Sequence, residues 1–168
     1  MKLAAFEAVA KVLDTAQVRY LVAGGLAVVA HGHVRLTLDI DLVVALDPNN
    51  THRAFKALAD IGYRPSVPVD AGSFAQAEQR QRWRDEKNMQ VLSFFSDDFP
   101  GTAVDVFVYE PFDFAREYEI ALQGELLPGL VARFVSIPTL IQMKRAAGRA
   151  KDLDDIQHLE WLQEDASR

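Results

Sequence analysis

The chain has 168 residues, with 18 lysines and arginines against 24 aspartates and glutamates, so its formal charge is −6. This length favours one domain with a core large enough to be stable without disulfides or a structural metal. The lack of cysteine excludes disulfides and thiolate metal sites. The acidic balance argues against a protein that coats nucleic acid by bulk charge, and no apolar run is long enough for a membrane helix, so we expect a cytoplasmic protein without a membrane partner.

Hydrophobic spacing and turn residues predict alternating helices and strands in the first half of the chain. Apolar residues at helical spacing indicate the first helix, and Asp47 followed by Pro48 is typical of a helix start. In chain order the predicted elements are a helix over 2–17, a strand over 19–23, a glycine pair, a helix over 26–31, a strand over 38–46, a helix from 47 to 61 stopped by Gly62, a loop over 63–73, a helix over 74–87 and a strand over 89–95.

The second half of the chain contains one strong strand, an ambiguous stretch and two final helices. These are a strand over 103–109, the stretch 112–136 with short strands expected near 118–122 and 131–135, a helix from Pro138 to about 150, and a helix over 152–163. The predicted fold class is α+β (mixed α/β), with a small mixed β-sheet flanked by helices and the C-terminal helices packed on the core.

A glycine pair, Gly24-Gly25, lies between the first strand and the next helix. Glycines let a backbone approach a ligand closely, and the start of a helix offers unpaired N–H groups to phosphate. A tight strand-to-helix turn without a ligand is the more common use of such a pair. The phosphate interpretation therefore depends on other residues.

Two carboxylates alternate with apolar residues in Leu38-Asp39-Ile40-Asp41-Leu42. Side chains two apart on a strand point the same way, so Asp39 and Asp41 are expected to project together while the three apolar residues face the core. The two charges repel each other unless a cation lies between them, and Mg²⁺ prefers carboxylate oxygens. The alternative is a solvated acidic face, although aspartate is poorly suited to a strand interior.

A third carboxylate, Asp105, interrupts the apolar strand near residue 104. One interpretation is a solvent-facing position on an amphipathic strand. The other is that strand pairing brings Asp105 beside Asp39 and Asp41. Two metal ions held ~4 Å apart by three carboxylates can clamp the attacking and leaving oxygens of a phosphoryl displacement. The carboxylate nearest the attacking hydroxyl can also act as general base.

Two longer motifs extend this pattern. Residues 20–43 pair a GG-x-A start with an H-G-x-x-R-x-T-x-D-I-D-L finish, and residues 137–160 contain a lysine before R-x-K-D-x-x-D. These motifs resemble the nucleotidyltransferase superfamily, which has the palm fold of DNA polymerase beta, and more narrowly the bacterial proteins that include abortive-infection toxin enzymes. The matching residues are Gly24, Gly25, Ala27, His31, Gly32, Arg35, Thr37, Asp39, Ile40, Asp41, Leu42, Lys144, Arg149, Lys151, Asp152 and Asp155, with Asp105 as the third acid.

This resemblance implies one nucleotidyltransferase-like domain over residues 1–168, with a catalytic core over about 18–110 and C-terminal helices over 137–165. It implies an NTP such as ATP as substrate, with two Mg²⁺ ions. The metal-binding and catalytic residues would be Asp39, Asp41 and Asp105, of which Asp105 would help to deprotonate the acceptor hydroxyl. The residues that hold the triphosphate would be Gly24, Gly25, Arg35, Thr37 and Lys144.

The C-terminal motif also has structural interpretations. Lys144 and Lys151 are seven residues apart, so they would share a face on one continuous helix, and surface lysines are the alternative. Arg149 and Asp152 are expected to form an ion pair between helices.

Two other groups are expected to have structural roles. His31 would fix the turn beside Gly32, His158 would lie at the surface or in packing, and no histidine cluster predicts zinc. The basic segment 80–84, with Trp83, is either an RNA or nucleotide contact or a solvated helix with the tryptophan docked on the core.

The leading hypothesis is a nucleotidyltransferase that moves a nucleoside monophosphate to a hydroxyl of tRNA, a protein or a small molecule. A sub-hypothesis adds an antitoxin partner. The alternatives are a catalytically inactive nucleotide- or partner-binding module of the same fold, for which the three intact acids give no support, and a phosphohydrolase that releases phosphate or nucleotide without labelling an acceptor.

Overall fold

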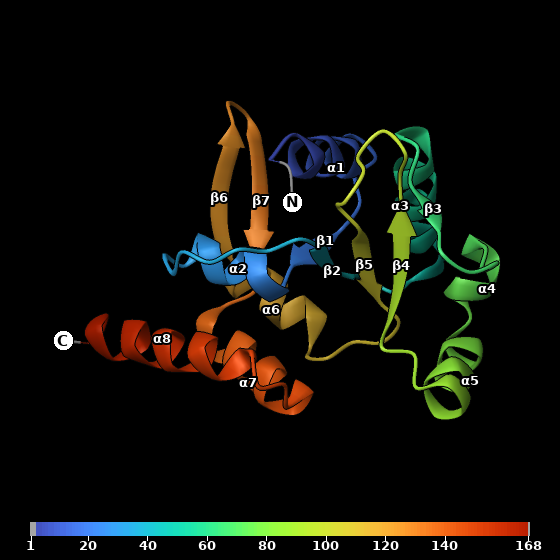
Figure 1. Cartoon of the computed structure of the whole chain (residues 1–168). Coiled ribbons are helices and arrows are strands. Elements are labelled where there is room, and N and C mark those ends of the chain that lie inside the picture. The colour runs from blue at the N-terminus through green and yellow to red at the C-terminus, as the bar shows by residue number, and fades with distance from the viewer. Residues whose placement is uncertain (1–2, 168) are drawn as a thin grey trace.

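A computed structural model describes residues 3–167 (Figure 1), and the strands of that part form one mixed sheet. In chain order they are β1 (Tyr20–Val22), β2 (Ile40–Val44), β3 (Arg64–Pro65), β4 (Val91–Phe95), β5 (Val104–Phe107), β6 (Leu122–Leu127) and β7 (Leu130–Phe134). Their order across the sheet is β3-β4-β5-β2-β1-β7-β6. β2 pairs in parallel with β5, and β1 with β7, whereas the other neighbours are antiparallel.

Helices flank this sheet, as the predicted mixed α/β fold requires (Figure 1). α1 packs against α3 and β7, α2 packs against β2 and α7, and α7 packs against α8. The helices are α1 (Leu3–Thr15), α2 (Gly24–Ala30), α3 (Pro48–Asp60), α4 (Ala71–Ala75), α5 (Ala77–Lys87), α6 (Phe114–Ile120), α7 (Ile137–Ala147) and α8 (Asp152–Asp165). Within residues 3–167, no helix combines the length and the apolar character that crossing a membrane requires.

The centre of the sheet places the acidic strands next to each other. In the β2–β5 pair, Asp41 lies directly opposite Asp105. The flanking residues Ile40, Leu42 and Val106 are buried, so both strands turn their apolar side to the core and their aspartates to the other face. The expected pairing of the two acidic strands is therefore confirmed.

Caps fix the ends of the helices near this centre. Asp47 Oδ1 accepts a hydrogen bond from the backbone N–H of Asn50 at 2.9 Å, with proline in the first turn of α3, as the sequence predicts. The buried carboxylate of Glu117 accepts hydrogen bonds from the Ser136 N–H at 2.6 Å and the Thr139 hydroxyl at 2.7 Å. Glu117 thereby anchors the start of α7 to α6, which fixes the direction in which α7 leaves the sheet.

Several predicted boundaries are wrong. The strand expected over 118–122 is mostly helix, because the Asp113 side chain caps α6 and its aromatic residues pack inward, so β6 begins only at Leu122. The loop expected over 63–73 contains β3 and the start of α4, and the helix expected over 74–87 is divided at Gln76.

Two predictions about the acidic and glycine-rich segments also need correction. Leu38 does not face the core: it is 57% exposed, because the chain enters β2 only at Ile40. The glycine pair does not separate strand from helix, since Gly24 and Gly25 are themselves the first residues of α2.

Candidate active site

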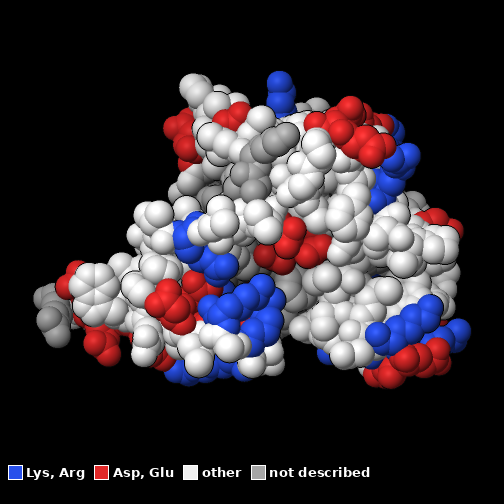
Figure 2. Space-filling view, in the orientation of Figure 1, with Lys and Arg blue, Asp and Glu red and all other residues white. Residues whose placement is uncertain are grey.

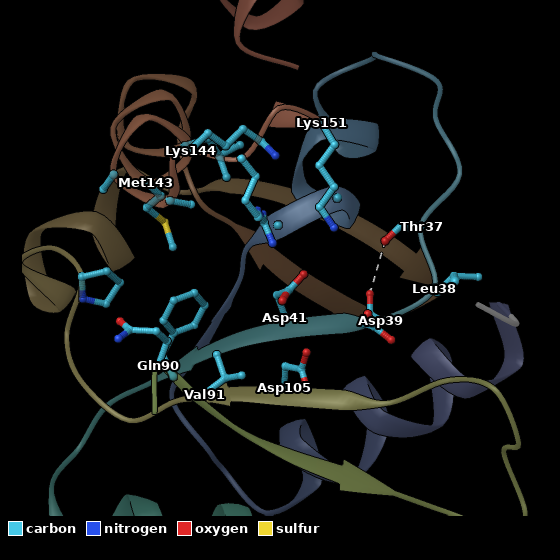
Figure 3. Close-up of a pocket in the computed structure, with 18 of the residues that line it drawn as sticks. Thr37, Leu38, Asp39, Asp41, Gln90, Val91, Asp105, Met143, Lys144 and Lys151 are labelled. Carbon is cyan, nitrogen blue, oxygen red and sulfur yellow. Dashed lines mark hydrogen bonds between the residues drawn. The ribbon is translucent and has the colours of Figure 1, made fainter. Parts of the chain in front are cut away.

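One cavity of about 950 Å³ lies between the sheet and the C-terminal helices, and it gathers the residues that the sequence motifs single out (Figure 3). In Figure 2, acidic side chains occupy the middle of this face, and basic side chains border them on the side of α7 and α8. The predicted site residues that line the cavity are Gly24, Gly25, Arg35, Thr37, Asp39, Asp41, Asp105 and Lys144. Their chemical roles remain predictions.

Two of the three carboxylates lie on adjacent strands, and the third lies just before one of them (Figure 3). Asp41 and Asp105 are neighbours across the β2–β5 pair, and Asp39 immediately precedes β2. Asp39 is exposed, whereas Asp41 and Asp105 are partly buried. The acids therefore form a gradient from solvent into the cavity, with all of their side chains available as oxygen ligands.

Burial and mutual repulsion disfavour the charge on two of these acids. Burial raises the pKa of Asp41 to about 6, and the charges of Asp105 and Asp39 add to this rise. Burial also raises the pKa of Asp105, although Ser93 Oγ donates a hydrogen bond to Asp105 Oδ1 at 2.5 Å and so favours its ionised form. A cation that binds all three carboxylates would remove the repulsion, and an all-oxygen donor set suits Mg²⁺.

The glycine pair makes room for the side chains of this site. Gly24 has φ +61°, and a Cβ atom there would lie 1.9 Å from Asp41 Oδ2. At Gly25 a Cβ atom would lie 2.7 Å from Thr37 Oγ1 and 3.5 Å from the guanidinium carbon of Arg35. Only glycine permits these close approaches, so the pair has a steric function whether or not it binds phosphate.

The loop between α2 and β2 is held from the C-terminal side of the molecule. The Arg35 guanidinium forms an ion pair with the buried carboxylate of Asp155 on α8. Further along the loop, the Thr37 hydroxyl donates a hydrogen bond to the Asp39 carbonyl at 3.4 Å (Figure 3). These contacts fix the path of the chain just before Asp39, the first of the three predicted catalytic acids.

Lys144 is buried in a charged cluster instead of standing free at the surface. Its side chain is 5% exposed, and its Nζ lies 2.7 Å from Asp155 and 3.3 Å from Asp152. Arg149 adds a further pair with Asp152, at 2.7 Å. The predicted ion pair thus forms, but it is local to the start of α8 and does not join two helices. The surface alternative for Lys144 is therefore wrong, and its charge is largely balanced within the protein.

Lys144 and Lys151 do not share one helix. Gly148 adopts φ +63° and ends α7, and Lys151 precedes α8, so the two helices are separate, as predicted, although the first ends at Ala147 and not near residue 150. The turn brings Arg149 and Lys151 to the cavity, where the Lys151 side chain extends toward the carboxylates (Figure 3). Neither residue was expected to contact the substrate. The signal for this turn was Gly148, since a glycine after a helical stretch is typical of a helix end.

The remaining cavity wall is apolar or neutral. Its aromatic and aliphatic part comes mainly from the end of β5 and from α7, and side-chain amides lie beside it. No acidic residue lines the cavity, within the described part of the chain, besides the three aspartates. The neutral lining residues are Leu36, Leu38, Asn88, Gln90, Val91, Phe107, Tyr109, Pro111, Leu140, Gln142, Met143, Ala146 and Ala147.

The basic segment on α5 has the structural role. Trp83 is 7% exposed and packs against Phe74, so it offers no free ring for base stacking. Arg80 is buried and donates a hydrogen bond to the Phe74 carbonyl, and the Arg84 guanidinium lies 3.8 Å from the centre of the Tyr109 ring. The docked-tryptophan interpretation is confirmed, and the segment gives no support to an RNA acceptor.

The histidines divide into two groups. His31 Nε2 lies 2.8 Å from the Val135 carbonyl oxygen, a contact that ties the end of α2 to the end of β7 and fits the predicted structural role. His33 and His158 stack on each other beside Asp154. Sequence spacing gave no sign of this contact, because the two histidines are 125 positions apart.

The mixed seven-stranded sheet and its helices match the fold of solved nucleotidyltransferase structures. The chain is similar to the solution structure of the antibiotic-resistance factor ANT(2'')-Ia, with 16% identity and a TM-score of 0.59 over 94% of this chain and 81% of that one. It is also similar to the crystal structure of ANT(2'')-Ia with adenylyl-2''-tobramycin, with 14% identity and a TM-score of 0.57 over 95% and 93% of the two chains. A scan against family models and a search of curated proteins give no match.

Proposed function

We propose that the chain is a Mg²⁺-dependent nucleotidyltransferase that moves a nucleoside monophosphate from an NTP to a hydroxyl acceptor. The observation that carries this proposal is the direct pairing of Asp41 with Asp105, with Asp39 immediately before the strand of Asp41 and a cationic wall across the cavity. In this proposal residues 18–110 form the catalytic core and residues 137–165 cover it.

The reaction requires one bond exchange at phosphorus. The acceptor oxygen attacks the α-phosphorus of the NTP, the bond from that phosphorus to the bridging oxygen breaks, and pyrophosphate leaves. Asp105 accepts the proton of the attacking hydroxyl. Ser93 holds one of its oxygens and leaves the other open, and the raised pKa of Asp105 makes it a better base than an exposed aspartate.

Asp39, Asp41 and Asp105 are the residues that would hold Mg²⁺. When bound, Mg²⁺ neutralises charge on the phosphates and on the leaving group. Burial, together with the neighbouring carboxylates, raises the pKa of Asp41 to about 6. A divalent cation would offset both costs, because it balances the buried charge and removes the repulsion between the carboxylates. In-line displacement otherwise needs mainly positioning and charge neutralisation from the protein.

Positive side chains on the opposite wall would hold the triphosphate. Arg149 and Lys151 border the cavity from the turn between α7 and α8. Lys144 and Arg35 also line the cavity and both pair with the buried Asp155, so we assign them a positioning role as well as a contribution to the positive potential. Arg149 is paired with Asp152 but is itself more exposed. The backbone at Gly24 and Gly25 would pass close to the phosphates.

The acceptor that this cavity favours is a small hydroxyl compound with little positive charge. One of the two similar structures, both of ANT(2'')-Ia, is a complex with adenylyl-2''-tobramycin, and tobramycin carries several amino groups that are protonated at neutral pH. Such a polycation needs carboxylates beyond those that bind metal, and the described cavity wall offers neutral or basic groups instead. Aromatic side chains such as Phe107 and Tyr109 suit a base or an acceptor with an apolar face.

A toxin-type enzyme with an antitoxin partner is a second candidate. The motif resemblance to abortive-infection toxin enzymes supports it, and so does the loop beside the cavity, where Val34 and Leu36 are 90% and 80% exposed. An antitoxin that covers this apolar loop would also block the cavity. In this case the acceptor is tRNA or a hydroxyl group on a protein.

The test is a label-transfer assay with Mg²⁺ and each α-labelled NTP, offered to tobramycin, to neutral hydroxylated compounds, to total RNA and to protein. Transfer to one acceptor class, with one pyrophosphate released for each label transferred, supports the proposal and names the acceptor. Asp105→Asn is the loss-of-function control. Transfer to tobramycin in preference to neutral acceptors would overturn the acceptor argument.

Two other outcomes have a defined meaning. NTP binding without transfer to any acceptor would indicate a catalytically inactive binding module. Release of free phosphate or nucleotide without a labelled acceptor would indicate a phosphohydrolase. Either result would refute the transferase proposal.

A further inference from the structure

A second cluster of metal-binding side chains lies outside the cavity, between the loop after α2 and the helix α8. It consists of His33, Asp154 and His158. His33 Nε2 lies 3.3 Å from Asp154 Oδ2, and the rings of the two histidines stack with their centroids 3.8 Å apart. Asp154 and His158 are four residues apart on α8, so they leave the same face of that helix.

The imidazole of His158 is in the tautomer that a metal ligand needs. Its Nδ1 lies 2.8 Å from the backbone oxygen of Asp154, and a carbonyl only accepts hydrogen bonds, so Nδ1–H is the donor. The lone pair of the neutral ring is therefore on Nε2. Metal-binding histidines commonly donate their other ring N–H to a carbonyl or carboxylate in this way.

A second, buried carboxylate lies near the same nitrogen of His33 that faces Asp154. Asp155 Oδ1 lies 3.9 Å from His33 Nε2, and Asp155 is itself fixed by Lys144 and Arg35. The His33 side chain is 14% exposed, whereas those of Asp154 and His158 are 69% and 45% exposed. One ligand is thus held by the fold and two can adjust to an ion that arrives from solvent.

We propose that His33, Asp154 and His158 form a site for a transition-metal ion of the Zn²⁺ type. One ligand atom from each residue lies within 4.8 Å of the others. Two atoms that each bind zinc at ~2.1 Å can be up to ~4.2 Å apart. The two rings stack with their planes 17° apart, and zinc binds in the plane of an imidazole, so the partly exposed His158 ring must turn out of the stack for both histidines to bind one ion. Three protein ligands with water as the fourth are a common zinc arrangement.

The two metal sites of this proposal differ in chemistry. Imidazole nitrogen suits Zn²⁺, Ni²⁺ and Cu²⁺, whereas the carboxylates of the cavity suit Mg²⁺. The histidine site joins the loop that carries Arg35 and Thr37 to α8. A bound ion therefore fastens the loop that leads into the active site to the C-terminal helix, in parallel with the ion pair between Arg35 and Asp155.

Zinc binding to the full chain without an affinity tag tests this site. Competition with a chromogenic chelator measures the affinity for Zn²⁺, and visible absorption of added Co²⁺ reports nitrogen ligands. We expect one equivalent with a dissociation constant in the micromolar range, unaffected by excess Mg²⁺. His33→Ala and His158→Ala should each weaken binding by at least about tenfold. Urea unfolding checks that both variants are folded.

Two matched variants make the result specific. His52 resembles His158 in one respect, because its Nδ1 lies 2.7 Å from the carbonyl oxygen of the residue four positions earlier, Pro48. His52 does not belong to the cluster of His33, Asp154 and His158, so His52→Ala should bind zinc like the wild type. Asp41→Asn should also retain binding, which shows that zinc is outside the cavity. The proposal fails if the wild type binds no zinc in the micromolar range, if His158→Ala binds as tightly as the wild type, or if Asp41→Asn abolishes binding.

Discussion

Replacing Asp41 with asparagine should stabilise the protein when no metal is present. Burial, together with Asp105 and Asp39, raises the pKa of Asp41 from 3.8 to about 6. Each pKa unit corresponds to about 1.4 kcal/mol, so a rise of about two units costs the ionised folded protein about 3 kcal/mol at neutral pH. Asparagine has nearly the same shape without the charge and removes this cost.

The effect has a defined pH window. The folded-state pKa of Asp41 is raised, so this carboxyl does not destabilise the protein below about pH 4, where it is protonated in both the folded and the unfolded states. As pH rises toward about 6, the unfolded chain ionises first and the folded protein loses stability; above that range the loss is constant. Asp41→Asn should therefore match the wild type near pH 4 and exceed its stability at pH 7.5.

Urea unfolding in the presence of a chelator, followed by tryptophan fluorescence, measures this difference at each pH. Asp39→Asn is the matched control: Asp39 is exposed, so the same substitution there should change the stability much less. Added Mg²⁺ should stabilise the wild type more than Asp41→Asn. A loss of stability in Asp41→Asn at pH 7.5, or equal effects of the two substitutions across the pH range, would refute the proposed crowding of charge.

Three further predictions concern the surroundings of the acids. Gly24→Ala should lower the free energy of unfolding by about 2 kcal/mol more than Gly101→Ala, because both glycines have positive φ but of the two only Gly24 has another atom within 4 Å of a new Cβ. An equal loss of stability in the two variants would contradict the close approach of Asp41 to Gly24. Lys144→Met should lower the free energy of unfolding in urea by about 3 kcal/mol, because it leaves the buried carboxylates of Asp152 and Asp155 without their lysine partner. An unchanged unfolding midpoint would show that Lys144 does not stabilise this cluster. Arg149→Ala should weaken NTP binding about tenfold in a fluorescent-nucleotide titration, whereas Arg145→Ala, outside the cavity, should not; a similar loss in both would mean that the effect is only general charge.

The geometry of the acids was predictable because it depends on local rules. Alternation along a strand places Asp39 and Asp41 on one side, and apolar neighbours identify the strand that carries Asp105. The one additional assumption was that the two strands pair, and the parallel register with Asp41 opposite Asp105 confirms it. Leu38 departs from the alternation because the regular strand starts two residues later.

The cationic side of the cavity was less predictable because it depends on how distant segments pack. Nothing in the sequence around Lys144 indicates that α8 folds back over it and supplies two carboxylates. The sequence did contain Gly148, yet only the left-handed turn that it forms shows that Arg149 and Lys151 face the cavity. Glu117 is a similar case, since its burial follows from capping a helix that begins 20 residues later.

Asp155 gives a physical reason why the two sequence motifs occur together. Its carboxylate binds Arg35 from the first motif and Lys144 from the second, and His33 lies within 3.9 Å of it. These contacts hold the loop between α2 and β2, α7 and α8 together as one unit. Removing one buried charge from the cluster would leave the other charges unpaired, which is costly. That unit sets the path of the chain into Asp39, and the C-terminal motif therefore supports the acids even where its residues do not touch a substrate.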